Sequence, residues 1–193
     1  MLILASQSPR RREMFDRLGV TYTAVSTDAD ETVSESLSPD EYVKCLALRK
    51  AEAAAGLFSK DDLIVAADTV VALDSKIFGK PKDFDEAFDM IAAFSGKTHE
   101  VYTAFALVKN GKAYSEAVAT RVTFRALSER EIAYYIEKEA PYDKAGAYGI
   151  QEMAGIFVEK VEGNFDNVVG LPLCQVEMAL KREFALSLFD FAN

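Results

Sequence analysis

Hydrophobic and polar residues follow one another along this chain in patterns typical of short strands and amphipathic helices. Two continuous apolar runs, Leu2–Ala5 and Leu63–Ala67, are typical of strands that are buried on both faces. The clearest hairpin has strands at 101–109 and 113–124 around Asn110-Gly111, the pair that a type I′ turn prefers. Shorter strands are predicted over residues 22–25, 70–73, 77–78 and 155–161.

The predicted helices begin at recognisable N-cap residues. Serine precedes proline at Ser8-Pro9 and Ser38-Pro39, and proline suits the first helical position because an N–H there would be unpaired. Two more helices are predicted after Asp83 and Ser128. A last amphipathic helix follows Pro172 and carries the apolar residues Val176, Met178, Leu180, Phe184 and Leu188.

The length of the chain suits one globular domain or a compact two-lobed one. With 193 residues, half of them hydrophobic, it can bury a core without a disulfide or a metal. We therefore treat residues 1–193 as a single domain. Cys45 and Cys174 fall in helical patterns, which favours buried thiols in a reducing compartment over a cross-link or a zinc site.

The formal net charge of −9 argues against non-specific binding to nucleic acid or to a membrane surface, since basic patches drive both. The chain can still bind a polyanion where its cations are concentrated. Strand-forming residues begin at Leu2, so no secretory signal is expected, and no apolar run is long enough to cross a bilayer. We expect a soluble, cytoplasmic protein.

The turn after the first strand is a candidate anion site. A strand that leads into a helix N-terminus presents backbone N–H groups and the positive end of the helix dipole. Hydroxyls of Ser6 and Ser8 and the guanidinium groups of Arg10, Arg11 and Arg12 surround this position. The stretch predicts either a phosphate cradle or an ordinary capped helix with solvated arginines, and taken alone it does not decide between them.

Asp68 has the strongest physical claim to function, because a carboxylate inside an apolar run is costly without a partner. The alternative is a structural pair with an arginine. Lys50 projects from near the apolar stripe of its helix, either to reach solvent or to reach a ligand. The acidic loop over residues 26–38 is either solvated or turns one carboxylate inward to hold a cation.

Residues 143–151 combine two glycines with polar and small side chains, which indicates either a flexible connection or a close approach to a ligand. His99 is the only histidine, and a surface or strand-end position is favoured for it over a catalytic triad. Multi-histidine zinc sites are excluded. The remaining arginine, lysine and carboxylate groups suit phosphoryl chemistry with a hard cation, Mg²⁺ or Mn²⁺.

Five segments in this order carry a family resemblance: Ser6-Gln7-Ser8-Pro9-Arg10-Arg11, Ala67-Asp68-Thr69, Lys80-Pro81, Asp143-Lys144-Ala145-Gly146-Ala147-Tyr148-Gly149-Ile150-Gln151 and Val169-Gly170-Leu171-Pro172. Together they resemble the motifs of the Maf family, the septum-formation-inhibitor-like nucleoside triphosphate pyrophosphatases. The fourth segment resembles the branch that acts on dTTP and UTP.

The resemblance implies an α/β fold like that of inosine-triphosphate pyrophosphatases, with an elongated mixed sheet, flanking helices and two lobes around a cleft. It implies cleavage of a nucleoside triphosphate to the monophosphate and pyrophosphate, with a divalent cation, in a homodimer. A nucleotide-binding regulator of septum formation that acts through a partner is the alternative function.

The resemblance also implies roles for single residues. Asp68 would be the catalytic carboxylate, as base, metal ligand or both, and Glu31 a second carboxylate for the metal. The other residues of the site would be the lysines Lys50 and Lys80, the phosphate-binding Ser6, Ser8, Arg10 and Arg11, and the nucleotide-selecting Arg10, Thr69 and Gln151. Arg12 would lie outside the site.

Overall fold

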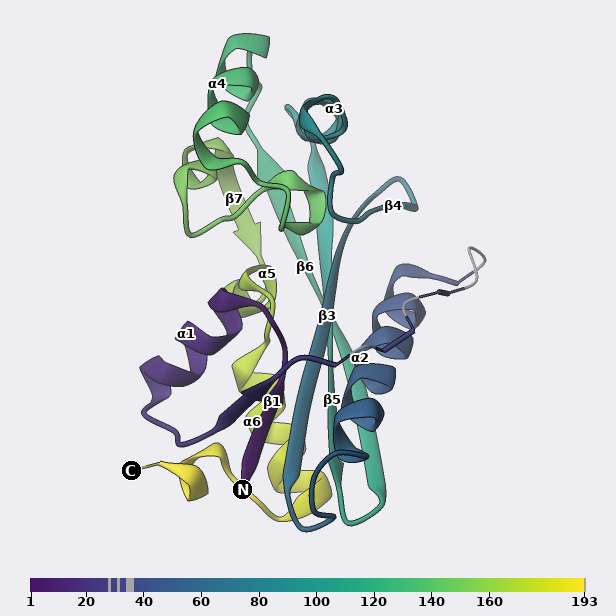
Figure 1. The fold of residues 1–193 in the computed structure, drawn as a ribbon. Helices are drawn as coiled ribbons and strands as arrows, with labels where there is room; N and C mark the ends of the chain where they lie inside the picture. The colour runs from purple at the N-terminus through teal and green to yellow at the C-terminus, as the bar shows by residue number, and fades with distance from the viewer. Residues whose placement is uncertain (28, 31, 34–36, 193) are drawn as a thin grey trace. The chain divides into compact units, whose positions relative to one another are not determined.

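The computed structural model describes residues 1–27, 29–30, 32–33 and 37–192 (Figure 1). The chain divides into two compact units: the first is Met1–Asp68, Thr103–Val118 and Gly170–Asn193, and the second is Thr69–Tyr102 and Ala119–Val169. The strands are β1 (Leu2–Ala5), β2 (Thr23–Val25), β3 (Leu63–Leu73), β4 (Lys76–Phe78), β5 (Thr98–Lys109), β6 (Lys112–Phe124) and β7 (Val158–Glu162).

The α-helices are α1 (Pro9–Leu18), α2 (Pro39–Ala55), α3 (Phe84–Phe94), α4 (Glu129–Glu139), α5 (Phe165–Val169) and α6 (Leu173–Ala179). Shorter helical turns are η1 (Ala145–Ala147), η2 (Met153–Phe157), η3 (Leu180–Phe184) and η4 (Leu188–Phe191). Within the described part of the chain, the strands form one seven-stranded sheet in the order β2-β1-β3-β5-β6-β7, with β4 paired to β3. Parallel and antiparallel pairs both occur, so the predicted α/β class with a mixed sheet and flanking helices is confirmed.

In the first unit, the buried strand β1 pairs in parallel with both β2 and β3. Figure 1 shows α1 and α2 on opposite sides of these strands. Helices on both sides explain why Leu2–Ala5 and Leu63–Ala67 are continuous apolar runs and not alternating ones. Both proline-led helices begin where the sequence predicts, at Pro9 and Pro39.

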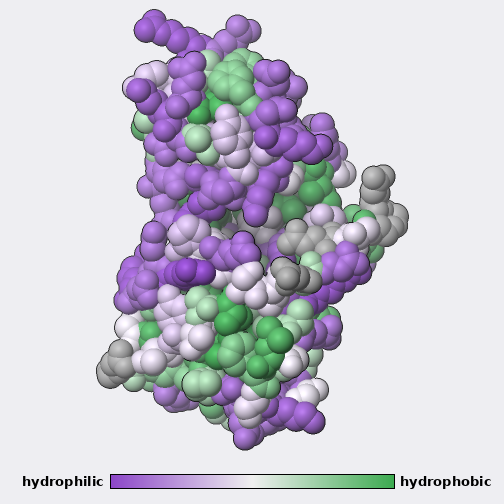
Figure 2. Space-filling model, viewed as in Figure 1, coloured by the Kyte–Doolittle hydropathy of each residue, from purple (hydrophilic) through white to green (hydrophobic). Residues whose placement is uncertain are grey.

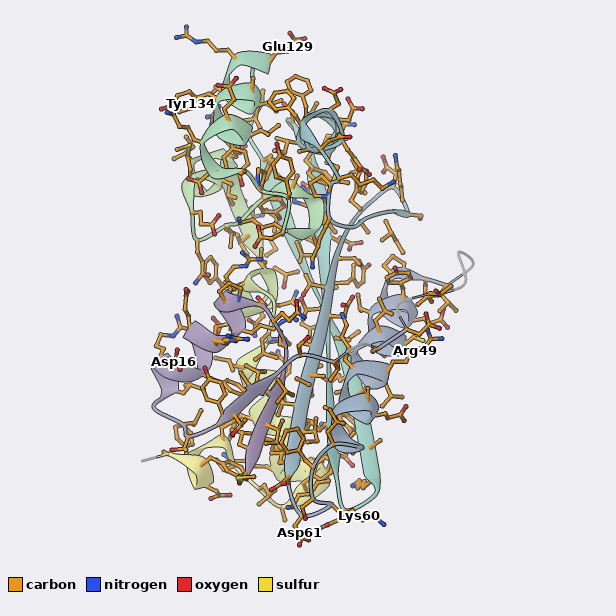
Figure 3. The ribbon with its side chains drawn as sticks, in the orientation of Figure 1. Asp16, Arg49, Lys60, Asp61, Glu129 and Tyr134 are labelled. Carbon is orange, nitrogen blue, oxygen red and sulfur yellow. The ribbon has the colours of Figure 1, made fainter. Side chains whose placement is uncertain are left out.

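In the second unit, α3 and α4 are in contact and pack on a core rich in aromatic side chains. Figure 3 shows Tyr134 on the outer side of α4, whereas its neighbour Tyr135 is fully buried. His99 lies inside this core, and its ring is 4.4 Å from that of Phe94. His99 lies at the start of β5, so the expected strand-end position is confirmed, whereas a surface position is wrong because the side chain points into this core.

The hairpin is confirmed, with positive φ at Asn110 and Gly111. The C-terminal helix is confirmed from Leu173 to Phe184, because η3 continues α6 without a break, and it ends at Ala185 in the left-handed conformation. Its predicted extension to Leu188 is wrong, since Leu188 belongs to η4, and Met178 is exposed and lies off the apolar face. Residues 155–157 belong to η2, because strand pairing with β6 starts only at Val158.

The expectation of two buried thiols is also wrong. Cys45 is half-buried and Cys174 is exposed on α6, and neither forms a disulfide with a described residue. None of the helices in the described ranges is long and apolar enough to cross a membrane.

Candidate active site

Two parallel strands of the first unit, β1 and β2, end at the same edge of the sheet, beside the middle of β3. The last residue of β1, Ala5, is in register with Val25 of β2 and Ala66 of β3, and β3 continues to Leu73. The chain therefore leaves β1 at Ser6 next to the part of β3 that carries Ala67 and Asp68. Ligands of open α/β sheets bind at this carboxyl edge, so the fold itself points to these segments.

The turn from β1 into α1 is held by the hydroxyl of Ser6, which is buried. Its Oγ accepts hydrogen bonds from the Ser8 backbone N–H at 3.2 Å and from Arg11 Nη1 at 3.2 Å. Ser8 stands at the N-cap as predicted, but its hydroxyl caps no N–H among the described residues. Gln7 Nε2 donates a hydrogen bond to Ser26 Oγ, which ties this turn to the end of β2.

The guanidinium of Arg11 connects three segments that are far apart in the sequence. Its Nε donates to the carbonyl of Gly170 at 2.7 Å, and Nη1 donates to the carbonyl of Ala67 at 2.9 Å as well as to Ser6. Burial lowers the pKa of Arg11 to about 10, against the attraction of Asp68, so the group stays charged at neutral pH. Three of the five resembling segments therefore meet at Arg11.

Asp68 forms an ion pair with a lysine, and the charge of Arg11 also interacts with it. Lys50 Nζ lies 2.6 Å from Asp68 Oδ1, and the two side chains are 18% and 14% exposed. The pair reduces the cost of holding a carboxylate on a largely buried strand. Lys50 reaches it because Ala47, Ala51 and Ala54 bury the adjacent face of α2.

Arg10 is half-buried and close enough to Arg11 for its charge to depress the pKa of Arg11. Arg12 is exposed. The structure thus brings Ser6, Arg11, Lys50 and Asp68 together within one unit, with Arg10 beside them. Such a set, several cations around one carboxylate, can bind a polyphosphate and orient a water molecule near it.

The acidic loop is anchored by Arg49 of α2, which Figure 3 labels. Its Nη1 donates to the carbonyls of Asp30 at 3.0 Å and Thr32 at 2.7 Å. Glu31 lies outside the described residues, as do Asp28 and Glu35, so its role as a second metal carboxylate stays a prediction.

A divalent cation would find one well-placed carboxylate. Among the described residues no group of three or more histidine, cysteine, aspartate or glutamate side chains could hold a metal ion. Mg²⁺ nevertheless binds through one or two carboxylates when substrate phosphates supply further oxygens, and Asp68 fits that requirement.

The other predicted residues belong to the second unit. Within it, the Gly146 N–H donates to the carbonyl of Gly79 at 2.9 Å, so the segment 143–151 lies against the residue before Lys80. Lys80 and Gln151 are exposed, and Thr69 is half-buried. Most of the segment is buried, which excludes the interpretation as a loose connection.

Sequence reasoning missed the partners that hold these residues. The carbonyls of Ala67 and Gly170 are backbone groups, which carry no sequence signal at all. Arg49 stands next to Lys50 and looks like any exposed helical arginine. Lys144 receives no role of its own in the sequence analysis, although acidic residues precede it at Asp143 and follow it at Glu152, within reach of an ion pair.

The fold and this geometry define a mixed α/β protein with cations and a carboxylate at the carboxyl edge of its parallel strands. A family model described as "Maf-like protein" matches residues 1–183. The chain belongs to the Maf family.

Relatives named dTTP/UTP pyrophosphatase match nearly the whole chain. The one from Alkaliphilus oremlandii is 44% identical over 97% of this chain and 98% of its own length. The one from Hahella chejuensis is 46% identical over 98% of this chain and 94% of its own length. A solved nucleoside-triphosphatase / dITP/XTP pyrophosphatase from Mycobacterium abscessus has 18% identity and a TM-score of 0.42, covering 65% of this chain and 74% of that one.

Proposed function

We propose that this protein is a nucleoside triphosphate pyrophosphatase that hydrolyses dTTP and UTP to the monophosphate and pyrophosphate. The observation that carries the proposal is the Lys50–Asp68 pair at 2.6 Å, with the Arg11 guanidinium near enough to interact with the Asp68 charge. The relatives that match the full length of the chain carry the name of this activity. A house-cleaning role in the nucleotide pool follows from such an activity.

The chemistry requires positive charge first, because a triphosphate repels an approaching nucleophile. Arg10 and Lys50 of the first unit supply that charge, and Ser6 and Ser8 add hydroxyl donors to the phosphate-binding turn. Lys80 would add a further charge, as predicted from the resemblance. Arg11 contributes its charge while its guanidinium holds the turn in place. Asp68 orients the attacking water or accepts its proton, a role worth about 10²- to 10⁴-fold in rate.

A bound Mg²⁺ or Mn²⁺ would neutralise part of the phosphate charge. Asp68 and, as predicted from the resemblance, Glu31 would hold it through carboxylate oxygens. Gln151 would select the nucleobase with Arg10 and Thr69, because an amide offers both a donor and an acceptor to a pyrimidine edge. Modified pyrimidine nucleotides are a further substrate class that this arrangement allows.

Pyrophosphate release from a panel of purified nucleoside triphosphates tests the proposal. Asp68→Asn should reduce release by at least about 100-fold. Asp74→Asn is the matched control, because Asp74 is an exposed carboxylate whose φ of 50° asparagine also adopts. Normal turnover by Asp68→Asn would contradict the assignment. Nucleotide binding without release by the wild-type protein would favour the alternative, a regulator of septum formation acting through a partner.

A cytoplasmic homodimer is part of the same proposal. Large apolar side chains are exposed in the first unit, among them Leu57, Met178 and Phe189, and Figure 2 shows an apolar area on the surface of this unit. Exposed apolar surface is typical of association sites. Light scattering after size exclusion measures the mass, and a monomer at all concentrations would contradict the dimer.

A further inference from the structure

A buried lysine pairs with two acidic side chains directly beside Gln151 in the second unit. Lys144 is only 8% exposed through its side chain, and its Nζ lies 2.9 Å from Asp143 Oδ1 and 3.1 Å from Glu152 Oε2. Asp143 is largely exposed, whereas Glu152 is the more buried partner. The Lys144–Glu152 pair therefore links the two ends of the segment from residue 144 to residue 152. Gln151 is the residue immediately before Glu152.

The absence of a side chain at Gly149 allows Lys144 and Glu152 to approach each other next to its backbone. A Cβ at Gly149 would come within 2.7 Å of Glu152 Oε2 and 3.0 Å of Lys144 Cε. The Glu152 N–H donates to the Gly149 carbonyl at 3.0 Å, and the Ala147 N–H donates to the Lys144 carbonyl at 3.1 Å. Side chains and backbone thus fix the same short turn, at whose end Gln151 is exposed.

Stability alone does not explain a buried lysine at this position. Apolar side chains of similar volume often replace a buried ion pair without loss of stability, whereas an ion pair imposes one geometry on its two partners. The geometry that this pair imposes includes the peptide between Gln151 and Glu152. A rigid turn fixes the backbone from which the exposed amide projects and so restricts the directions in which its donor and acceptor can point.

We propose that the Lys144–Glu152 pair is a positioning device for Gln151 and thereby helps to set the choice of nucleobase. The proposal rests on the proposed function, in which Gln151 reads the pyrimidine edge. Lys144 and Glu152 are positioning residues: they act on the nucleotide through Gln151.

The test compares kcat/KM for UTP with kcat/KM for CTP in three single variants. Lys144→Met should lower the UTP-to-CTP ratio by about 10- to 100-fold, the size expected for a contact displaced by up to about 1 Å. Glu152→Gln, which keeps the shape and removes the charge, should lower it in the same direction. Lys160→Met is the control, because Lys160 is 61% exposed in its pair with Glu162 in the same unit. This variant should keep the wild-type ratio.

The decisive comparison uses the Gln151→Ala background. If Lys144 acts through Gln151, the double variant Lys144→Met with Gln151→Ala should have the same UTP-to-CTP ratio as the single variant Gln151→Ala. A purely structural role would instead lower kcat for both nucleotides equally, in both backgrounds, and that result would overturn the proposal. Should Lys144→Met fail to fold, the same comparison with Glu152→Gln decides.

The failure of the proposed function looks different. A wild-type protein that releases no pyrophosphate from any nucleotide overturns the pyrophosphatase and this inference together. A wild-type protein that prefers UTP, with Lys144→Met and Glu152→Gln variants of unchanged preference, overturns only the inference.

Discussion

Replacing Arg11 by lysine tests whether its guanidinium holds the carboxyl edge of the first unit together. Lysine keeps the positive charge but offers a compact ammonium in place of a planar fork. The acceptors of Arg11 are approached from two different nitrogens, Nε for Gly170 and Nη1 for Ala67 and Ser6. One ammonium at the end of a flexible chain satisfies only part of this set.

The expected loss follows from the hydrogen bonds. A hydrogen bond to a charged group contributes about 1.5–3 kcal/mol, and a buried acceptor left without a donor costs about 1–3 kcal/mol. If the ammonium recovers one of the three acceptors and water reaches another, the free energy of unfolding falls by about 2–4 kcal/mol. That is a large part of the total for a protein whose stability is on the order of 5–15 kcal/mol.

Urea unfolding followed by circular dichroism measures this loss, with Arg12→Lys as the matched control. Arg12 is the next residue of the same helix and is exposed, so its replacement should change the free energy of unfolding by no more than about 0.5 kcal/mol. The reasoning is refuted if Arg11→Lys and Arg12→Lys unfold at the same urea concentration with the same slope.

Two further predictions concern the core of the second unit. Burial lowers the pKa of His99 from 6.5 to about 4, so the unfolded chain binds its proton first. The stability from neutral His99 is complete above pH 6.5 and is lost as the pH falls towards 4. His99→Phe should remove up to about 3 kcal/mol of this pH dependence in urea titrations, and an unchanged dependence would contradict the burial argument. Gly146→Ala should cost about 2–4 kcal/mol, because its φ is +67° and the new Cβ would lie 2.6 Å from Val71 Cγ2. The control Gly111→Ala, at φ +76° with no described atom within 4 Å, should cost only about 1 kcal/mol, and equal losses would show that crowding plays no part.

The elements that the sequence predicts well are those fixed by local chemistry. Proline at the first helical position, serine at the N-cap and Asn110-Gly111 in the hairpin act within a few residues, so their outcome needs no tertiary information. The apolar runs of β1 and β3 are also predicted well from the sequence, because burial on both faces of a strand requires continuous apolar residues.

The errors have two kinds of cause. The apolar spacing after Pro172 continues to Leu188, yet the helix ends locally, where Ala185 takes the left-handed conformation and the Leu186 N–H donates to the Leu180 carbonyl. His99 is buried because Phe94 and Tyr148 enclose it, and Tyr148 is 49 residues away along the chain. No window of sequence around His99 contains that information.

The family motifs therefore contain two kinds of residue that look alike in the sequence. Some hold parts of the protein together, and others act on the substrate. Arg11 directs its donors at Ala67, 56 residues away, and at Gly170, 159 residues away, so much of its value lies in joining segments. Lys144 similarly forms ion pairs with Asp143 and Glu152, and Gln151 beside them is exposed. Mutation should separate the two kinds: residues whose polar groups face the protein alter stability or substrate choice, whereas Asp68 alters the rate. A motif residue is therefore not always a substrate ligand: on the proposed assignment, Arg11 and Lys144 hold other parts of the site in position, whereas Asp68 takes part in the reaction.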